Sequence, residues 1–203
     1  MKVYQVSVGP MQNFSYIVED ESTQEVIIID PSWDLEKLTK IINEQNLNPK
    51  YIVNTHWHDD HTRGNEELAK ELSVKIVQHN ASQLKNDLTV SDGDSIKFGC
   101  SELAVYHTPG HSKDSICLVG DGKIFSGDTL FVGNCGRVDL PGGSSKELYH
   151  SLFDVIGNLD DNLVLYPGHD YGSAVTTTIG REKQMNPVMQ KTSEAEFIER
   201  MGG

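Results

Sequence analysis

The sequence predicts an α/β protein in which two β-sheets pack face to face and helices lie outside them. The first half of the chain alternates strand-like runs with helical periods, which predicts parallel strands covered by helices. The second half starts again with short strands and then returns to helices. No low-complexity linker separates the halves, so one compact αβ/βα domain over residues 1–203 is expected.

Period-two alternation, apolar runs and turn residues define the strands of the first half. Those strands are Lys2–Val8, Asn13–Val18, Glu25–Ile29, Tyr51–Asn54 and Lys75–Gln78. The first helix follows Asp34, because Leu35, Leu38, Ile41 and Ile42 recur at helical spacing. A second helix is expected over Asn65–Leu72.

Glycines separate the short strands of the second half. They are expected at Ser95–Phe98, Glu102–Tyr106, Ser115–Val119 and Lys123–Phe125. A helix from Ser145 to about Ile156 places Leu148, Leu152 and Val155 on one face. The last strand is expected at Leu163–Tyr166 and a terminal helix at Glu194–Met201.

The composition of the 203-residue chain excludes several classes of protein. Thirty acidic against seventeen basic side chains give a formal charge of −13, which disfavours a nucleic-acid backbone or an anionic membrane as partner. The sequence contains no apolar run long enough to span a bilayer and no secretory signal pattern. Three cysteines without a C-x-x-C pair predict a reducing compartment, and we expect a cytoplasmic protein.

Three imidazoles and two carboxylates follow the expected strand Tyr51–Asn54 directly, in the segment Thr55-His56-Trp57-His58-Asp59-Asp60-His61. A loop at a strand end can direct several side chains to one point, because the sheet fixes its base. Neutral imidazole and carboxylate are the ligands that hold zinc, iron or manganese. The segment therefore predicts a metal site, against the alternative of a solvated polar loop.

Further metal-ligand candidates follow three later strands. They lie in His107–His111, Ser126–Asp128 and Pro167–Asp170, each beside a glycine that lets the backbone turn sharply. Each segment alone is weak evidence. Together with the histidine-rich loop, they predict one site assembled at the strand ends.

The series His56-x-His58-x-Asp60-His61, followed by His111, Asp128 and His169, resembles the metallo-β-lactamase superfamily over essentially the whole chain. The resemblance implies a four-layer αββα sandwich, in the α/β (α+β) class, with metals at one edge of the sheets. It implies that one metal is held by His56, His58 and His111, and a second by Asp60, His61 and His169. It also implies that Asp128 bridges the two metals and that Asp30 orients the metal loop from behind the ligands.

Within this superfamily, the sequence resembles type II glyoxalase (hydroxyacylglutathione hydrolase) at three places. These are Gly64-Asn65-Glu66, His107–His111 and Gly127–Phe131. Only 34 residues follow His169, however. That is too few for the helical glutathione-binding domain of full-length glyoxalases, so no separate C-terminal domain is expected.

The persulfide dioxygenase group is resembled elsewhere in the chain. The matching segments are Asp92–Gly99, Cys135–Asp139, Leu148–Ser151, His169–Tyr171 and Asn186-Pro187. One departure is Leu140-Pro141, which replaces the aromatic-polar pair expected in the dioxygenases.

The leading interpretation is a metal-dependent hydrolase of the glyoxalase II type that cleaves a small thioester, such as an S-acylglutathione. Two divalent metals, zinc first and iron or manganese otherwise, would lower the pKa of a bound water to give the attacking hydroxide. Asp60 and Asp128 are the catalytic carboxylates, with Asp60 orienting the hydroxide. Arg137 and Tyr171 match positions that face the thiol portion of the substrate in the relatives, although a surface ion pair and a packed aromatic are equally compatible with the sequence.

The alternative interpretation is a non-haem persulfide dioxygenase with a single Fe(II). His56, His111 and Asp128 form the two-histidine, one-carboxylate set typical of such enzymes. A non-catalytic metal module and a nuclease of the same superfamily are weaker alternatives, the latter disfavoured by the dispersed basic residues. The expected partner is a small thiol-derived substrate, without nucleic acid or membrane, and a homodimer is left open.

Overall fold

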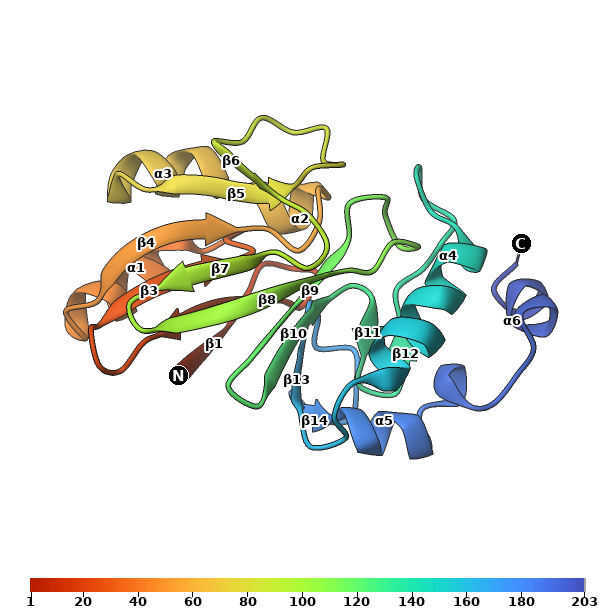
Figure 1. The fold of residues 1–203 in the computed structure, drawn as a ribbon. Coiled ribbons are helices and arrows are strands. Elements are labelled where there is room, and N and C mark those ends of the chain that lie inside the picture. The colour runs from red at the N-terminus through yellow and green to blue at the C-terminus, as the bar shows by residue number, and fades with distance from the viewer. Residues whose placement is uncertain (203) are drawn as a thin grey trace.

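Two six-stranded sheets form the centre of the protein in a computed structural model that describes residues 1–202 (Figure 1). The strand order is β1-β2-β3-β4-β5-β6 in the first sheet and β14-β13-β10-β9-β8-β7 in the second. Helices α1 and α3 lie on one outer side, and the C-terminal helices lie on the other. The αββα arrangement expected from the sequence is thereby confirmed.

The first sheet combines antiparallel and parallel pairs. Its strands are β1 (Lys2–Val8), β2 (Asn13–Glu19), β3 (Glu25–Ile29), β4 (Asn48–Val53), β5 (Lys75–His79) and β6 (Leu88–Val90). β1, β2 and β3 pair antiparallel, whereas β3, β4, β5 and β6 pair parallel as the alternation with helices predicts. Ile29, Val53 and Val77 lie side by side, so the loops after these strands leave from one edge of the sheet.

The second sheet brings two more loops to the same region. Its strands are β7 (Ser95–Phe98), β8 (Ser101–His107), β9 (Ile116–Gly120), β10 (Lys123–Gly127), β13 (Val164–Pro167) and β14 (Thr177–Thr178). β10 and β13 are parallel, with Gly127 opposite Pro167. Asp128 and His169 therefore follow neighbouring strand ends.

The helices occupy the outer layers and the connections. They are α1 (Leu35–Glu44), α2 (Asp59–Thr62), α3 (Asn65–Leu72), α4 (Ser145–His150), α5 (Ile179–Met185) and α6 (Glu194–Arg200). The helix expected from Ser145 to Ile156 begins as α4, but continues as a π-helical turn over Ser151–Val155 and a 3₁₀ turn over Ile156–Asn158.

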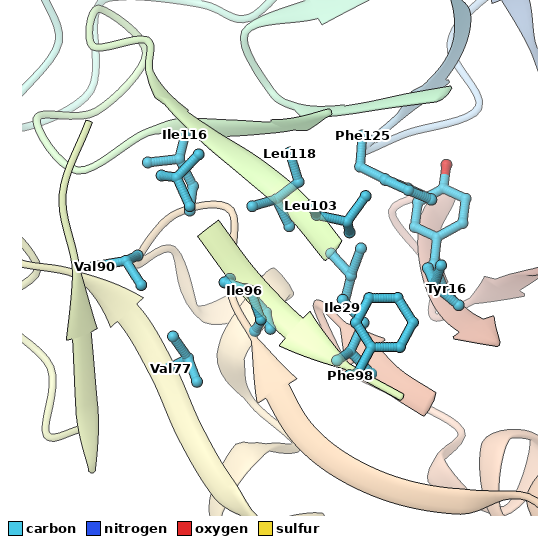
Figure 2. Close-up of a cluster of buried hydrophobic side chains, with 14 of the residues drawn as sticks. Tyr16, Ile29, Val77, Val90, Ile96, Phe98, Leu103, Ile116, Leu118 and Phe125 are labelled. Carbon is cyan, nitrogen blue, oxygen red and sulfur yellow. The ribbon is translucent and has the colours of Figure 1, made fainter. Parts of the chain in front are cut away.

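Buried apolar side chains from both sheets meet in the middle of the sandwich (Figure 2). Ile29 and Val77 come from the first sheet, and Leu103, Leu118 and Phe125 come from the second. Two further clusters lie outside the sheets. One packs α1 and α3 against the first sheet, and the other packs α4, α5 and α6 against the second. This burial on both faces explains why β3 reads as an uninterrupted apolar run.

Several short elements are absent from the sequence-based expectations. They are α2, β6, β14, α5, the 3₁₀ turn Pro187–Met189 and the hairpin of β11 (Leu130–Phe131) and β12 (Asn134–Cys135). Strands and turns of two or three residues carry too little periodicity to be recognised, and α2 forms one helical turn of four polar residues, DDHT, without an apolar stripe. The α5 segment of seven residues, IGREKQM, contains a glycine and shows no apolar stripe.

Candidate metal centre

All seven candidate ligands predicted from the sequence converge at one edge of the sandwich. They come from the loop after β4 and the adjoining α2, and from the loops after β8, β10 and β13. The parallel pairing of β10 with β13 brings Asp128 and His169 together, and the packing of the two sheets adds the loops after β4 and β8. Most of these side chains are buried: His56, His61, His111, Asp128 and His169 are each less than 8% exposed.

The first group consists of His56, His58 and His111, which each offer one ring nitrogen within 4.8 Å of those of the other two. The Nδ1 atom of His58 is 2.9 Å from Nε2 of His111. The three rings meet edge to face, with centroids 4.6 to 4.9 Å apart. Three imidazoles arranged around one point form a donor set suited to a transition metal.

The second group consists of Asp60, His61 and His169. Nε2 of His61 lies 3.2 Å from Nε2 of His169, and both lie about 3.5 Å or less from the same oxygen, Oδ2 of Asp60. Three ligand atoms at these spacings surround a point about 2 Å from each, which is the bond length of zinc to nitrogen or oxygen.

Asp128 lies between the two groups. Its carboxylate oxygens are 3.3 Å from His61 Nε2, 3.3 Å from His169 Nε2 and 3.5 Å from His111 Nε2. One carboxylate thus faces histidines of both groups. This is the place that the resemblance assigned to a bridging ligand.

Hydrogen bonds on the far side of three rings select the nitrogen that faces the centre. Nδ1 of His61 donates to Asp30, Nδ1 of His111 to the carbonyl of Arg137, and Nδ1 of His169 to the carbonyl of Met11. In each ring, Nε2 is then free to accept a metal. Such partners fix the tautomer and orientation of metal-ligating histidines.

Asp30 supports the ligand loop from behind, as the sequence resemblance implied. Its carboxylate accepts hydrogen bonds from the backbone N–H and the hydroxyl of Thr55, at 2.7 and 2.6 Å, as well as from His61. It lies with His56 and His61 in a third group of potential ligand atoms. Because both its oxygens already accept hydrogen bonds, we assign it to support and not to ligation.

Two buried polar atoms of the centre have no hydrogen-bond partner among the described residues. They are Nε2 of His56 and Oδ1 of Asp128. Buried polar atoms are nearly always satisfied in folded proteins, so each of these needs a partner that the polypeptide does not supply. A divalent cation between the histidines would satisfy both, and the donor set therefore fits a metal.

Burial and neighbouring charges shift the pKa values of the candidate ligands. Burial, followed by the charge of His111, lowers the pKa of His58 to about 4. Burial opposes the charge on His169, but the carboxylate of Asp128 prevails and raises the pKa of His169 to about 10. Burial likewise opposes ionisation of Asp128, yet the charges of His61 and His169 hold its pKa well below the usual range. The Asp128 carboxylate is thus an anion, and an imidazole Nε2 that binds a metal must release its proton to do so.

A cavity of about 390 Å³ opens onto the centre. Five of the candidate ligands face it: His58, Asp60, His111, Asp128 and His169. Its wall includes Phe131, Leu140, Arg137 and Tyr171, so the two predicted substrate residues do border this cavity. The Tyr171 ring stacks on His169 at 4.5 Å, whereas the exposed Arg137 forms an ion pair with Asp139.

One residue of the centre escaped the sequence-based reasoning. Asn13, at the start of β2, is 1% exposed and donates from Nδ2 to the carboxylate of Asp60 at 2.9 Å. The same nitrogen lies 3.5 Å from both His61 and His169. An asparagine after a Gly-Pro turn gives no sign in the sequence that it contacts metal ligands. Its position beside them results from the packing of β2 against the loop that carries His169.

The other histidines and the cysteines lie apart from the ligand groups. His79 stacks on His107 at 4.1 Å, and His150 pairs with Asp154 on the surface. Cys100, Cys117 and Cys135 are all free. Cys135 borders the cavity, but burial raises the pKa of its thiol to about 12, so the thiol is a poor nucleophile.

Gly168 makes a specific test of the centre possible. A Cβ atom at this position would lie 2.2 Å from Oδ1 of Asp128. Gly168 does not have a left-handed backbone conformation, so an alanine there adds no backbone strain of that kind. Gly168→Ala is therefore expected to displace Asp128 and to lower metal affinity by about tenfold or more. Competition with a chelator measures this affinity. Gly157→Ala, remote from the centre, should bind metal like the unchanged protein, and equal affinity in both variants would contradict the assignment.

The fold and the site define the class of this protein. Residues 8–169 match the Metallo-beta-lactamase superfamily, and the chain belongs to that superfamily. None of the helices within residues 1–202 is long and apolar enough to cross a membrane.

Within the superfamily, the chain is similar to persulfide dioxygenases and to a hydroxyacylglutathione hydrolase. The human protein "Persulfide dioxygenase ETHE1, mitochondrial" is 35% identical over 93% of this chain and 76% of its own length. The crystal structure of ETHE1 from Myxococcus xanthus superimposes with a TM-score of 0.95 at 31% identity, covering 100% of this chain and 91% of that one. A "Probable hydroxyacylglutathione hydrolase" of Schizosaccharomyces pombe is 29% identical, over 91% of this chain and 85% of its length.

Proposed function

We propose that this protein is an iron-dependent dioxygenase that oxidises the terminal sulfur of a small-thiol persulfide. The observation that carries the proposal is the end-to-end likeness to persulfide dioxygenases, which includes the segment after His169. The hydroxyacylglutathione hydrolase is less similar in sequence. The order of preference expected from the sequence is thus reversed, since the glyoxalase-like motifs alone ranked the hydrolase first.

The residues of the centre fit this reaction. Fe(II) held by His56, His111 and Asp128 would offer open positions for dioxygen and for a substrate sulfur. The Arg137 carbonyl fixes His111 so that Nε2 faces the centre. Phe131 and Leu140 restrict water at the wall, and the Arg137 guanidinium provides a positive charge for an anionic group of the thiol carrier.

A second candidate function is hydrolysis of a small thioester, the interpretation that the sequence motifs ranked first. It is favoured by the complete second group of Asp60, His61 and His169, which a single-iron enzyme does not require. In this reaction, two divalent metals would polarise the thioester and activate water. Asp60, held by Asn13, would orient the attacking water.

One experiment with a matched variant separates the two functions. Protein purified without added metal is analysed for zinc, iron and manganese, and is then assayed for oxygen uptake with glutathione persulfide and for hydrolysis of S-lactoylglutathione. We expect one iron per chain, oxygen uptake and no thioester cleavage. Asp60→Asn should retain that iron. Two zinc ions per chain, thioester hydrolysis and loss of one metal in Asp60→Asn would overturn the proposal in favour of the hydrolase.

Partners and compartment follow from the same chemistry. We propose a small thiol-derived substrate, with no nucleic-acid or membrane partner, in keeping with the charge of −13. Three free cysteines favour a reducing compartment such as the cytoplasm. A homodimer remains an open proposal that sedimentation would test.

Arg137 provides a test of substrate binding that is separate from metal binding. Its side chain is exposed, and Asp139 accepts hydrogen bonds from only two of its donor groups, Nε and Nη2. Arg137→Ala is expected to raise KM by about five- to tenfold, because the substrate loses one charge-assisted hydrogen bond that solvent partly screens. The kcat and the metal content should stay unchanged. Asp139→Asn retains the guanidinium and is the control. Equal KM values in both variants would exclude Arg137 from substrate binding.

A further inference from the structure

Part of the cavity wall is built by a short segment that we name the pocket hairpin, residues Leu130–Cys135, whose Phe131 ring meets His169 of the second ligand group edge to face. It follows the ligand Asp128 and leads directly to Arg137. Phe131, Asn134 and Cys135 of this hairpin all border the cavity. Its two strands have only two residues each, so the pairing between them cannot fix its position.

Two buried side chains from the C-terminal segment hold the pocket hairpin. Asn186, 0% exposed, donates from Nδ2 to the carbonyls of Phe131 and Asn134, at 3.4 and 3.1 Å. Glu182, 2% exposed, accepts the backbone N–H of Gly133 at 2.8 Å. The contacts thus reach both strands of the hairpin and the turn between them.

The two side chains also fix each other. Nδ2 of Asn186 donates to the carboxylate oxygen of Glu182 that accepts from Gly133, at 2.8 Å. Oδ1 of Asn186 accepts the N–H of Val188 at the start of the 3₁₀ turn Pro187–Met189. Every polar atom of the Asn186 amide is therefore used, and the side chain has one defined orientation.

We propose that Glu182 and Asn186 are positioning residues that set the shape of the substrate pocket through the pocket hairpin. They touch neither the ligand groups nor the cavity. Their effect on the reaction must therefore pass through Phe131, Asn134, Cys135 and the adjoining Arg137. This gives the Asn186-Pro187 motif a role, and it gives residues after His169 a function in substrate recognition. The proposal rests on the proposed function only for the choice of substrate.

The kinetic test uses graded variants. Asn186→Ala and Glu182→Ala should each raise KM for glutathione persulfide by about tenfold, while kcat and metal content stay within about twofold, because the ligands do not move. Glu182→Gln keeps a carbonyl oxygen for the Gly133 N–H and should restore KM to within about twofold. Gln190→Ala is the matched control. It removes contacts to the backbone of Lys183, Gln184 and Asn186 but none to the hairpin.

Unchanged KM in folded, metal-loaded Asn186→Ala and Glu182→Ala would overturn the proposal. Equal losses of kcat and metal in these variants would overturn it as well, because they would indicate general destabilisation. If Asn186→Ala does not fold, Asn186→Ser carries the test, since its hydroxyl is too short to reach both carbonyls.

A second readout distinguishes failure of this proposal from failure of the proposed function. In a Cys100→Ser background, the rate at which Cys135 reacts with a thiol reagent reports the order of the hairpin without any substrate. We expect about tenfold faster labelling in Asn186→Ala than in Gln190→Ala, because the buried thiol gains access when the hairpin loosens. Identical labelling rates in Asn186→Ala and Gln190→Ala would contradict the positioning role even if the enzyme oxidises persulfides. Faster labelling of Asn186→Ala, together with no persulfide oxidation by the unchanged protein, would contradict the proposed function but not the positioning role.

Discussion

Asp128→Asn is expected to abolish activity and to empty the metal centre. The carboxylate faces both ligand groups, within 3.3 to 3.5 Å of three histidines. An amide would keep the shape but remove the charge and turn an NH₂ group toward metal or imidazole. Changes behind metal ligands already cost 10- to 100-fold, so loss of a direct ligand should lower activity by more than about 100-fold.

Metal analysis and assays of the purified variant check this prediction. Asp59→Asn is the matched control for metal content, because Asp59 belongs to the neighbouring α2 and its exposed carboxylate, although it borders the cavity, pairs with Arg63. That control should keep its full metal content. If Asp128→Asn did so too, Asp128 would have no role as a ligand. If the variant kept the fold and bound metal but lost activity, its role would be confined to chemistry.

Asp30→Asn is expected to destabilise the protein even in the absence of metal. The Asp30 carboxylate accepts from the Thr55 N–H, the Thr55 hydroxyl and His61 Nδ1. An amide in either orientation leaves at least one of these buried donors opposite another donor. The cost is about 2–4 kcal/mol, which for a chain of this size lowers Tm by about 5–15 °C.

The backbone itself should tolerate this substitution. Asp30 has φ of 51°, a left-handed conformation that asparagine also adopts readily. Asp34 has φ of 49° and lies on the surface at the start of α1, so Asp34→Asn is a control with the same chemistry and the same backbone region. Thermal unfolding of metal-free protein measures both variants. A Tm shift no larger for Asp30→Asn than for Asp34→Asn would contradict the supporting role of Asp30.

The sequence was informative where physical patterns are long or chemically unusual. The strands β1 and β3 and the helix α3 occur at the predicted boundaries, because their alternation, apolar run and helical periodicity each extend over five or more residues. The ligand candidates could be recognised because a His-x-His-x-Asp-His segment directly after a strand is a rare combination.

Very short elements and contacts between residues far apart in the chain could not be predicted from the sequence. The pocket hairpin has two residues per strand, and its support by Asn186 joins positions more than fifty residues apart. Asn13 likewise reaches Asp60 and His169 only because β2 lies beside the loop after β13. No periodicity of the chain encodes such contacts.

By itself, the sequence determined the layered α/β class, the order of the main elements and the residue types of the centre, since local propensity and side-chain chemistry are properties of short segments. Tertiary structure alone decided which atoms of those residues face one another. The pairing of the strands and the packing of the two sheets bring four loops to one edge, and Asp30 and two backbone carbonyls then direct the histidine Nε2 atoms inward. Those contacts depend on how distant segments pack, and packing is a property of the whole chain.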